Sequence, residues 1–174
     1  MSTGSIAVPT VAALAFISCN SLNSTDRSET PTPPSGVPQA ASAVLFEPIE
    51  EASSPFSLIP DRRRLVIREA AEWQSFWSDL YSNVAPPPEL PVVDFGRQMV
   101  IAATMGQRPT GGYAIDIEDV FEEGRTLFPV VLETSPGPLC VNTQVMTAPA
   151  VAVLVDRTDS SVSFVEQTGT IDCG

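Results

Sequence analysis

The residues of this chain that could take part in chemistry are its carboxylates and cysteines. The sequence contains 21 Asp and Glu residues and nine basic residues, all of them arginine, with no His. Without His and Lys, the chain lacks the parts for Ser-His-Asp or Cys-His catalysis, for a His-bearing zinc site, and for a Schiff base or P-loop lysine. We therefore expect no enzyme, no catalytic residue, no metal and no cofactor.

Carboxylate chemistry is the enzymatic alternative that this composition leaves open. It would use residues such as Asp94, Asp116 and Glu118, two of which would have to converge in a cleft with separated pKa values. The acidic residues are instead scattered, with no calcium-loop spacing, and Asp94 is typical of a residue that caps a turn. The net charge of −12 disfavours nucleic acid and anionic lipid as partners.

The segment from Met105 to Tyr113 has the composition of a turn between two strands. An apolar run precedes it at 99–103, and alternating apolar residues follow it at 113–118. Proline and glycine favour a tight reversal, so we expect a hairpin whose strands are antiparallel neighbours and whose exposed tip carries Arg108. The requirements of a turn explain every residue type in this segment except Arg108. The functional alternative is a partner-binding loop formed by Gln107, Arg108, Pro109, Thr110, Gly111, Gly112 and Tyr113.

The same region resembles a known family. Residues 92–100, followed by 106–115, are similar to the C-terminal domain of the PrcB family, which is named for a subunit of a bacterial surface protease complex. The resemblance extends from about Ser57 to Phe164 and includes Trp73 and Trp77, the turn at 136–138 and the step at 147–149. It implies an accessory subunit that associates with a secreted or surface protease, so we expect a protein partner.

A second resemblance concerns the loop alone. Residues 109–113 are similar to the Asn-Pro-Thr-Thr-Gly-Tyr loop of chagasin-type protease inhibitors, with Arg108 in place of Asn and Gly111 in place of a Thr. Those inhibitors have an immunoglobulin-like sandwich and insert the loop into a protease active site. The resemblance implies an inhibitor acting through residues 108–113 as the alternative function.

The N-terminus predicts export. Residues 6–18 form an apolar run that has signal-peptide length and is too short to span a bilayer. The step from Phe16 to Cys19 resembles a relaxed lipobox, so we expect 1–19 to be a signal peptide and Cys19 to be lipidated. The protein would then be a cell-envelope lipoprotein, in the periplasm or on the outer surface, that meets the membrane only through this anchor. A plain signal peptide followed by secretion is the alternative, because no Lys or Arg precedes the apolar run and Phe16 stands where the lipobox usually has Leu.

The composition changes twice more along the chain. Residues 20–43 are rich in Ser, Thr and Pro and poor in large apolar residues, which predicts a disordered tether. We expect residues 44–174 to form the PrcB-like domain. Short apolar runs separated by turn signals predict a mainly β fold, either a β-sandwich or a partly open barrel.

One amphipathic helix should pack on the sheet. Apolar residues spaced by three and four predict it, and they are Ala70, Trp73, Phe76, Trp77 and Leu80. We expect both indoles in the core; a sugar-binding or partner groove is the alternative for this stripe. The run 62–64 of three arginines is expected to pair with nearby acids.

Two cysteines remain once Cys19 is set aside. In an exported chain without His or Lys to activate a thiolate, Cys140 and Cys173 are expected to form a disulfide. The bond would fix a C-terminal tail, 167–174, that has few apolar contacts of its own.

Overall fold

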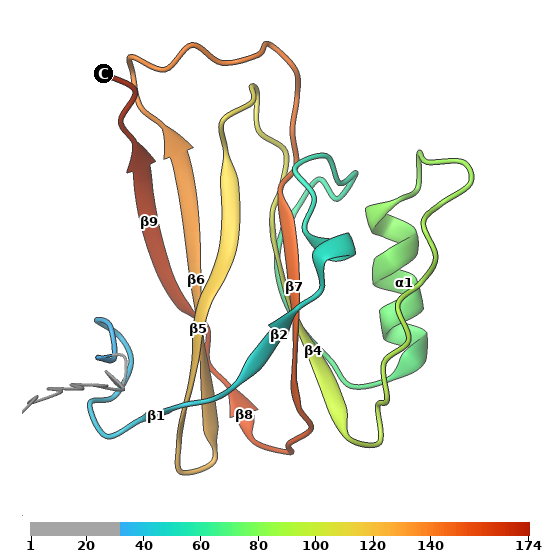
Figure 1. The fold of residues 1–174 in the computed structure, drawn as a ribbon, viewed down its shortest axis with the longest axis vertical. Helices are drawn as coiled ribbons and strands as arrows, with labels where there is room; N and C mark the ends of the chain where they lie inside the picture. Colours follow the sequence, from blue (N-terminus) through green and yellow to red (C-terminus); the bar gives the residue numbers. More distant parts are fainter. Residues whose placement is uncertain (1–31) are drawn as a thin grey trace, which may run out of the picture.

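The computed structural model describes residues 32–174, in which two β-sheets stack face to face and one α-helix covers the outer face of one sheet (Figure 1). The predicted β-sandwich with a single packed helix is confirmed. The predicted signal peptide, Cys19 and the first part of the predicted tether lie outside the described residues.

One sheet has four strands and a fully buried centre. Its order is β2 (Phe46–Pro48), β7 (Ala150–Asp156), β4 (Gln98–Met105) and β3 (Arg62–Ile67), and every pair is antiparallel. Strand β4 is buried from Met99 to Met105, because the second sheet covers one face and the helix covers the other. A strand buried on both faces has a continuous apolar sequence, as the run at 99–103 does.

The other sheet has five strands, with β5 (Ala114–Glu123) and β6 (Thr126–Pro136) at its centre. Strand β1 (Ser42–Ala43) pairs with β5, and both β8 (Ser161–Val162) and β9 (Val165–Ile171) pair in parallel with β6. A register shift between Ile117 and Asp119 changes which residues of β5 face inward. Beyond it, Val120 packs between the sheets and Phe121 packs on the outer face.

The expected hairpin across the Met105–Tyr113 turn is wrong. Strand β4 belongs to the four-stranded sheet and β5 to the five-stranded sheet, so the segment between them crosses from one sheet to the other. Both edges of β4 are already occupied, by β3 and β7. The inward side chains of β4 and β5 meet across the core between the sheets, and the two strands do not pair edge to edge.

The folded region begins earlier than the sequence suggests, and its C-terminal tail is mostly a strand. Val37 is only 5% exposed and packs against Phe121, Val130 and Val165, so the expected boundary at residue 44 falls inside packed chain. The tail at 167–174, expected to be fixed only by the disulfide, lies mostly in β9, which pairs with β6 over its whole length. The sequence of β9 is mostly polar, so main-chain pairing, and not side-chain burial, keeps this strand in the sheet.

Helix α1 (Ala70–Leu80) packs its aromatic side chains on the four-stranded sheet. Trp73 is 2% and Trp77 is 5% exposed, which confirms that both indoles belong to the core. Each indole Nε1 donates a hydrogen bond to a main-chain oxygen in the proline-rich segment that follows, at 3.0 Å to Pro91 and 3.0 Å to Pro88. Facing the helix, the sheet presents small residues that leave room for the indoles, Ala102, Ala150 and Ala152.

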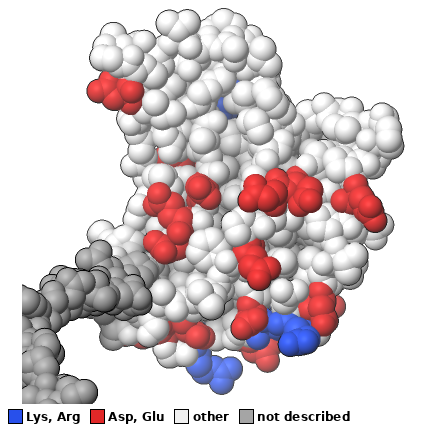
Figure 2. Space-filling view, in the orientation of Figure 1, with Lys and Arg blue, Asp and Glu red and all other residues white. Residues whose placement is uncertain are grey.

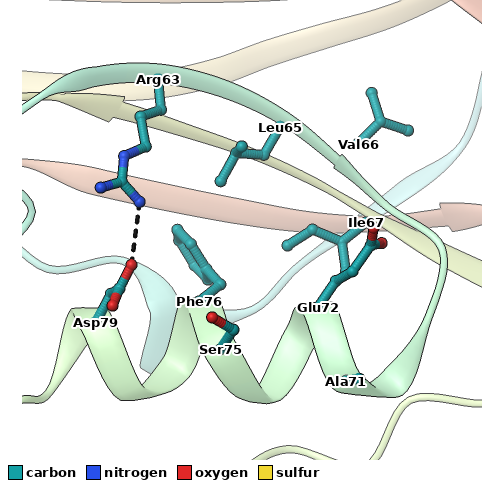
Figure 3. Close-up of a pocket in the computed structure, with 9 residues that line it drawn as sticks. All are labelled: Arg63, Leu65, Val66, Ile67, Ala71, Glu72, Ser75, Phe76 and Asp79. Carbon is teal, nitrogen blue, oxygen red and sulfur yellow. Dashed lines mark hydrogen bonds and ion pairs between the residues drawn. The ribbon is translucent and has the colours of Figure 1, made fainter.

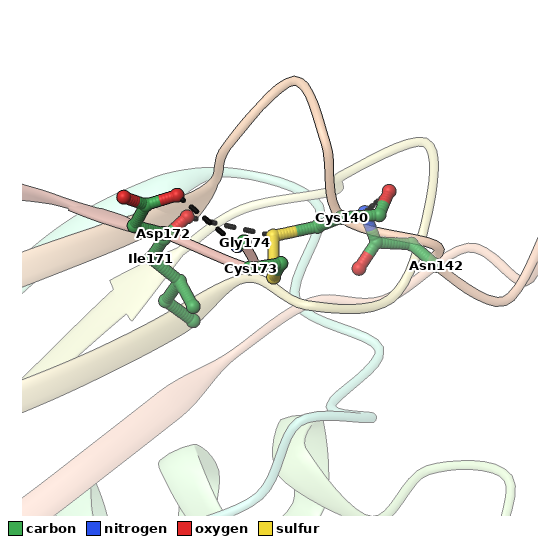
Figure 4. The surroundings of a disulfide bond; sticks show 6 residues. All are labelled: Cys140, Asn142, Ile171, Asp172, Cys173 and Gly174. Carbon is green, nitrogen blue, oxygen red and sulfur yellow. Dashed lines mark hydrogen bonds between the residues drawn. A yellow bond between two sulfur atoms is a disulfide. The ribbon is translucent and has the colours of Figure 1, made fainter.

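The disulfide between Cys140 and Cys173 is confirmed, with 5.0 Å between the Cα atoms (Figure 4). It ties the connection between β6 and β7 to the chain segment after β9. A closed loop of 33 residues contributes roughly 3 to 4 kcal/mol on a chain-entropy estimate. Within residues 32–174, no helix has the length and hydropathy of a membrane span.

The helix interface gives a direct stability test. Trp73→Ala should lower the free energy of unfolding by about 3 to 5 kcal/mol, because it opens a large cavity and leaves the Pro91 oxygen without its donor. Gln74→Ala, at the exposed neighbouring position, should change it by less than about 0.5 kcal/mol. Urea unfolding followed by circular dichroism measures both, and equal effects would show that the indole is not core.

Candidate functional site

Three connections meet at one end of the sandwich, and we call them together the loop end. They are residues 53–60, 106–113 and 137–149. The last connection lies between the other two: Ala148 N donates to Pro55 O at 2.9 Å, and Arg108 N donates to Thr147 O at 2.7 Å. Return bonds run from Ser57 N to Ala148 O and from Thr147 N to Arg108 O. The loop end is therefore one hydrogen-bonded unit built from distant parts of the chain.

The predicted partner-binding loop is part of this unit and is held along its length. At its start, Gly106 has φ 73°, and a Cβ there would lie 2.8 Å from the Pro60 oxygen. Further along, Gly111 N donates to Thr143 O at 2.9 Å, and Thr147 Oγ1 donates to Thr110 O at 2.9 Å. Seven residues were predicted as the site. Of these, three are exposed (Gln107, Pro109, Gly112), three are half-buried (Arg108, Thr110, Tyr113) and Gly111 is buried.

Arg108 is not the exposed tip that the sequence suggests. Its side chain is 30% exposed and folds back so that the guanidinium carbon lies 5.7 Å from the centre of the Tyr113 ring. Its Nη2 is 3.7 Å from Glu133 Oε2, and its Nε is buried without a hydrogen-bond partner. The side chain thus connects the loop to the body of the sandwich.

Glu133 belongs to an ion-pair network that joins the two sheets. Its Oε1 accepts hydrogen bonds of 2.6 Å from Arg62 Nε and 2.6 Å from Arg64 Nη2. Both arginines also bond to Glu166 on β9, at 2.6 and 2.7 Å. The prediction that arginines 62–64 pair with acids is confirmed, and for Arg62 and Arg64 these acids lie in the opposite sheet.

The network sets the charge state of Glu133, whose side chain is 11% exposed. Burial by itself would raise its pKa. Hydrogen bonds from Arg64 and Arg62, together with their positive charge, outweigh burial and hold the pKa of Glu133 below the ordinary value of 4.5. The carboxylate is therefore a fixed structural anion.

The surface of the loop end is almost free of charge. Charged residues make up 17% of the chain, but the three connections contain only one, Arg108. They also carry six large apolar side chains that face solvent: Phe56, Leu58, Leu139, Val141, Val145 and Met146. Figure 2 shows the contrast, since acidic groups form a band across the middle of the molecule and the upper end is mostly white.

The carboxylates weighed as an enzymatic alternative are not brought together. Asp94 precedes β4, at the end opposite the loop end, and its Oδ1 accepts a 3.0 Å hydrogen bond from Gly96 N, as a turn cap does. Asp116 and Glu118 lie on β5, in the other sheet. Within residues 32–174 there is no group of three or more Cys, Asp or Glu side chains placed to hold a metal ion.

Two of the connections and the strands around them fall within one stretch of chain. Residues 99–156 match the PrcB C-terminal family model. The expected PrcB resemblance is thereby confirmed over a segment that runs from β4 to β7 and includes the loop 106–113 and the connection 137–149. No curated protein and no solved structure matches the chain.

The sequence-based site covered only part of the loop end. It placed the PrcB-matching loop 107–113 correctly as a connection but missed residues 53–60 and 137–149. A usable signal was present, because both segments combine large apolar residues with no charge at all. Such residues without periodicity, between proline and glycine turn signals, indicate exposed apolar loops.

The ion-pair network predicts a pH-dependent stability. Because the folded state holds Glu133 at a lowered pKa, the unfolded chain binds more protons below about pH 4.5, so this contribution is present above that pH and is lost as the pH falls through the folded pKa. Glu133→Gln should cost about 1 to 3 kcal/mol at neutral pH and flatten the acid decline. Urea unfolding across pH measures both effects. Glu123→Gln, at an exposed position, is the control; an acid decline that is equally steep in both variants would contradict the assignment.

Proposed function

We propose that this protein is an exported, non-catalytic binding module that associates with a secreted or surface protease as an accessory subunit, through the loop end. The observation that carries this proposal is a surface with only one charged residue and six exposed apolar side chains, on a chain of net charge −12. Exposed apolar patches of this kind mark interaction sites on otherwise polar proteins. The centres of protein interfaces are likewise depleted in charged residues.

The hydrogen bonds within the loop end also support binding. Free loops lose conformational freedom when they bind, and that loss reduces affinity. Here residues 147–150 bond on one side to 54–57 and on the other to 108–110. A surface that is already ordered can use more of its apolar burial, roughly 25 cal/mol per Å², for affinity.

The kind of partner and the location rest on separate observations. A protease partner is proposed from the PrcB match over residues 99–156. Export is proposed from the apolar run at 6–18, and the Cys140–Cys173 disulfide supports it, because such bonds persist in oxidising compartments. Lipidation at Cys19 would place the module in the cell envelope and leave the loop end free for its partner.

A second function, protease inhibition through residues 108–113, is favoured by one feature of the fold. The loop passes from one sheet to the other at an end of the sandwich and bonds to both other connections, from Gln107 N to Pro60 O and from Arg108 N to Thr147 O. Flanking loops of this kind can frame a segment that enters a cleft. The two functions differ in their effect on the bound protease: an inhibitor lowers its activity, whereas an accessory subunit leaves it active.

Matched aspartate variants test the proposed surface. Val141 is 102% exposed at the loop end, and Val92 is 96% exposed in the connection between α1 and β4. Tagged full-length protein is used to capture proteases from the native envelope fraction, with an active-site-directed probe to identify them. Val141→Asp should reduce capture at least about tenfold because it buries an unpaired charge in the interface. Val92→Asp should capture as much as wild type.

Three results of this experiment test the position of the interface, the kind of partner and the effect on it. Equal capture by both variants places the interface elsewhere, and absence of any protease in the wild-type capture overturns the proposed partner. If a protease is captured, its peptidase activity with and without this protein separates the subunit from the inhibitor.

A further inference from the structure

A groove of about 460 Å³ runs between strand β3 and helix α1, away from the proposed interface. In Figure 3 the helix runs along the bottom and β3 above it, and the apolar lining residues Leu65, Ile67 and Phe76 lie between them. Leu65 and Ile67 are two residues apart on one strand, so their side chains lie on the same face. On its strand side, the groove therefore has apolar side chains at the two-residue spacing of an extended chain.

Strand β3 is also an open edge. In the order β2-β7-β4-β3, it is the last strand, and among the described strands only β4 pairs with it. In an antiparallel sheet, every second residue of an edge strand points its main-chain N–H and C=O away from the sheet. Because residues 63 and 65–67 of this strand line the groove, its outward main-chain groups are a template for an added strand.

The charges that usually protect such an edge are neutralised here. Lysine, arginine or other charged side chains on an edge strand discourage the addition of another chain. Arg62 and Arg64 are bound to Glu133 and Glu166 on the other side of the strand. Arg63 is bound to Asp79 at 3.0 Å, at one end of the groove.

The remaining charge of the groove is acidic. Glu72 lies on its rim, with Oε2 accepting a hydrogen bond from Arg68 N at 3.1 Å. Arg63 and Asp79 cancel, so the groove carries a net negative charge in a chain of −12. Acidic segments and a second copy of this chain are repelled, whereas a basic segment is attracted.

We propose that this groove binds an extended segment of a partner protein, which adds as a strand to the open edge of β3. The segment places alternate apolar side chains over Leu65, Ile67 and Phe76 and a basic side chain beside Glu72. Main-chain pairing supplies affinity and the alternating side chains supply selectivity, as in other strand-addition sites. This site does not depend on the loop end or on a protease partner.

The test uses full-length protein and a capped peptide of alternating valine and lysine. Calorimetry gives the Kd, and NMR shifts of the β3 amides locate the contact. We expect binding in the micromolar to millimolar range, with shifts along β3. Replacing lysine by glutamate in the peptide should weaken binding at least about tenfold, and methylating alternate peptide nitrogens should abolish it because the strand donors are lost.

Two tryptophan variants on the helix provide the matched control. Ser75 lines the groove and Ser78 does not, although both are exposed residues of α1. Ser75→Trp should fill the groove and weaken the peptide at least about tenfold, and Ser78→Trp should leave the Kd unchanged. Val141→Asp should also leave it unchanged, which separates this site from the loop end.

Each contrary result overturns the proposal. These results are no binding at about 1 mM peptide, equal binding by the methylated or the glutamate peptide, equal Kd values for Ser75→Trp and Ser78→Trp, and shifts confined to residues outside β3 and α1. Concentration-dependent dimerisation through β3, detected by sedimentation, would assign the edge to a second copy of the chain instead.

Discussion

Strand β4 lies between two apolar layers, and its side chains alternate between them. Met99, Ile101 and Ala103 pack against the other sheet, while Val100 and Ala102 pack under the helix. With β3 and β7 on its two edges, β4 has no free side left for β5. The chain that leaves β4 must therefore pass to the other sheet, and it does so at the loop end.

The pairing of β3 and β7 with β4 also brings the other two connections to the loop end. The chain enters β7 from residue 149 and β3 from residue 60, and both of these strands lie beside β4 with their starts next to its end. Main-chain hydrogen bonds continue past the strands, from Met105 N to Pro149 O and from Gln107 N to Pro60 O. The loop end is thus an extension of the four-stranded sheet beyond its regular pairing.

Ion pairs connect the two sheets at the edge formed by β3. Arg62 and Arg64 reach from the edge of one sheet to Glu133 and Glu166 in the other. Because Glu133 also lies near Arg108, the loop 106–113 is connected to this network. Exposed ion pairs contribute little to stability, but a partly buried network with several hydrogen bonds to one carboxylate is worth more.

Local pattern predicted the elements well and their neighbours poorly. The spacing of Trp73 and Trp77 was sufficient for the helix and its buried face, and the apolar run at 99–103 was sufficient for a strand. Nothing in that run indicates which strand lies beside it, so the sequence predicts a hairpin at 106–113, where the chain in fact crosses between the sheets. Strand β9 was missed because main-chain pairing, and not side-chain burial, holds its polar sequence.

The candidate site shows the same limit. The loop 107–113 could be found because glycine and proline mark a turn and because the segment resembles PrcB. The hydrogen-bond partners of that loop come from distant segments: Pro60 lies 47 residues before Gln107, Thr143 lies 32 residues after Gly111, and Thr147 lies 39 residues after Arg108. Contacts over such separations depend on the whole topology, and no local pattern encodes them.

Native-state hydrogen exchange of the full-length protein tests most directly whether the loop end is one ordered unit. The amides of Ser57, Arg108, Gly111 and Thr147 all donate to main-chain oxygens of neighbouring connections. We expect them to exchange together, with protection close to that of amides in β4. If they exchange as fast as an unstructured loop while β4 stays protected, the loop end is not preordered, and the account of its binding surface is contradicted.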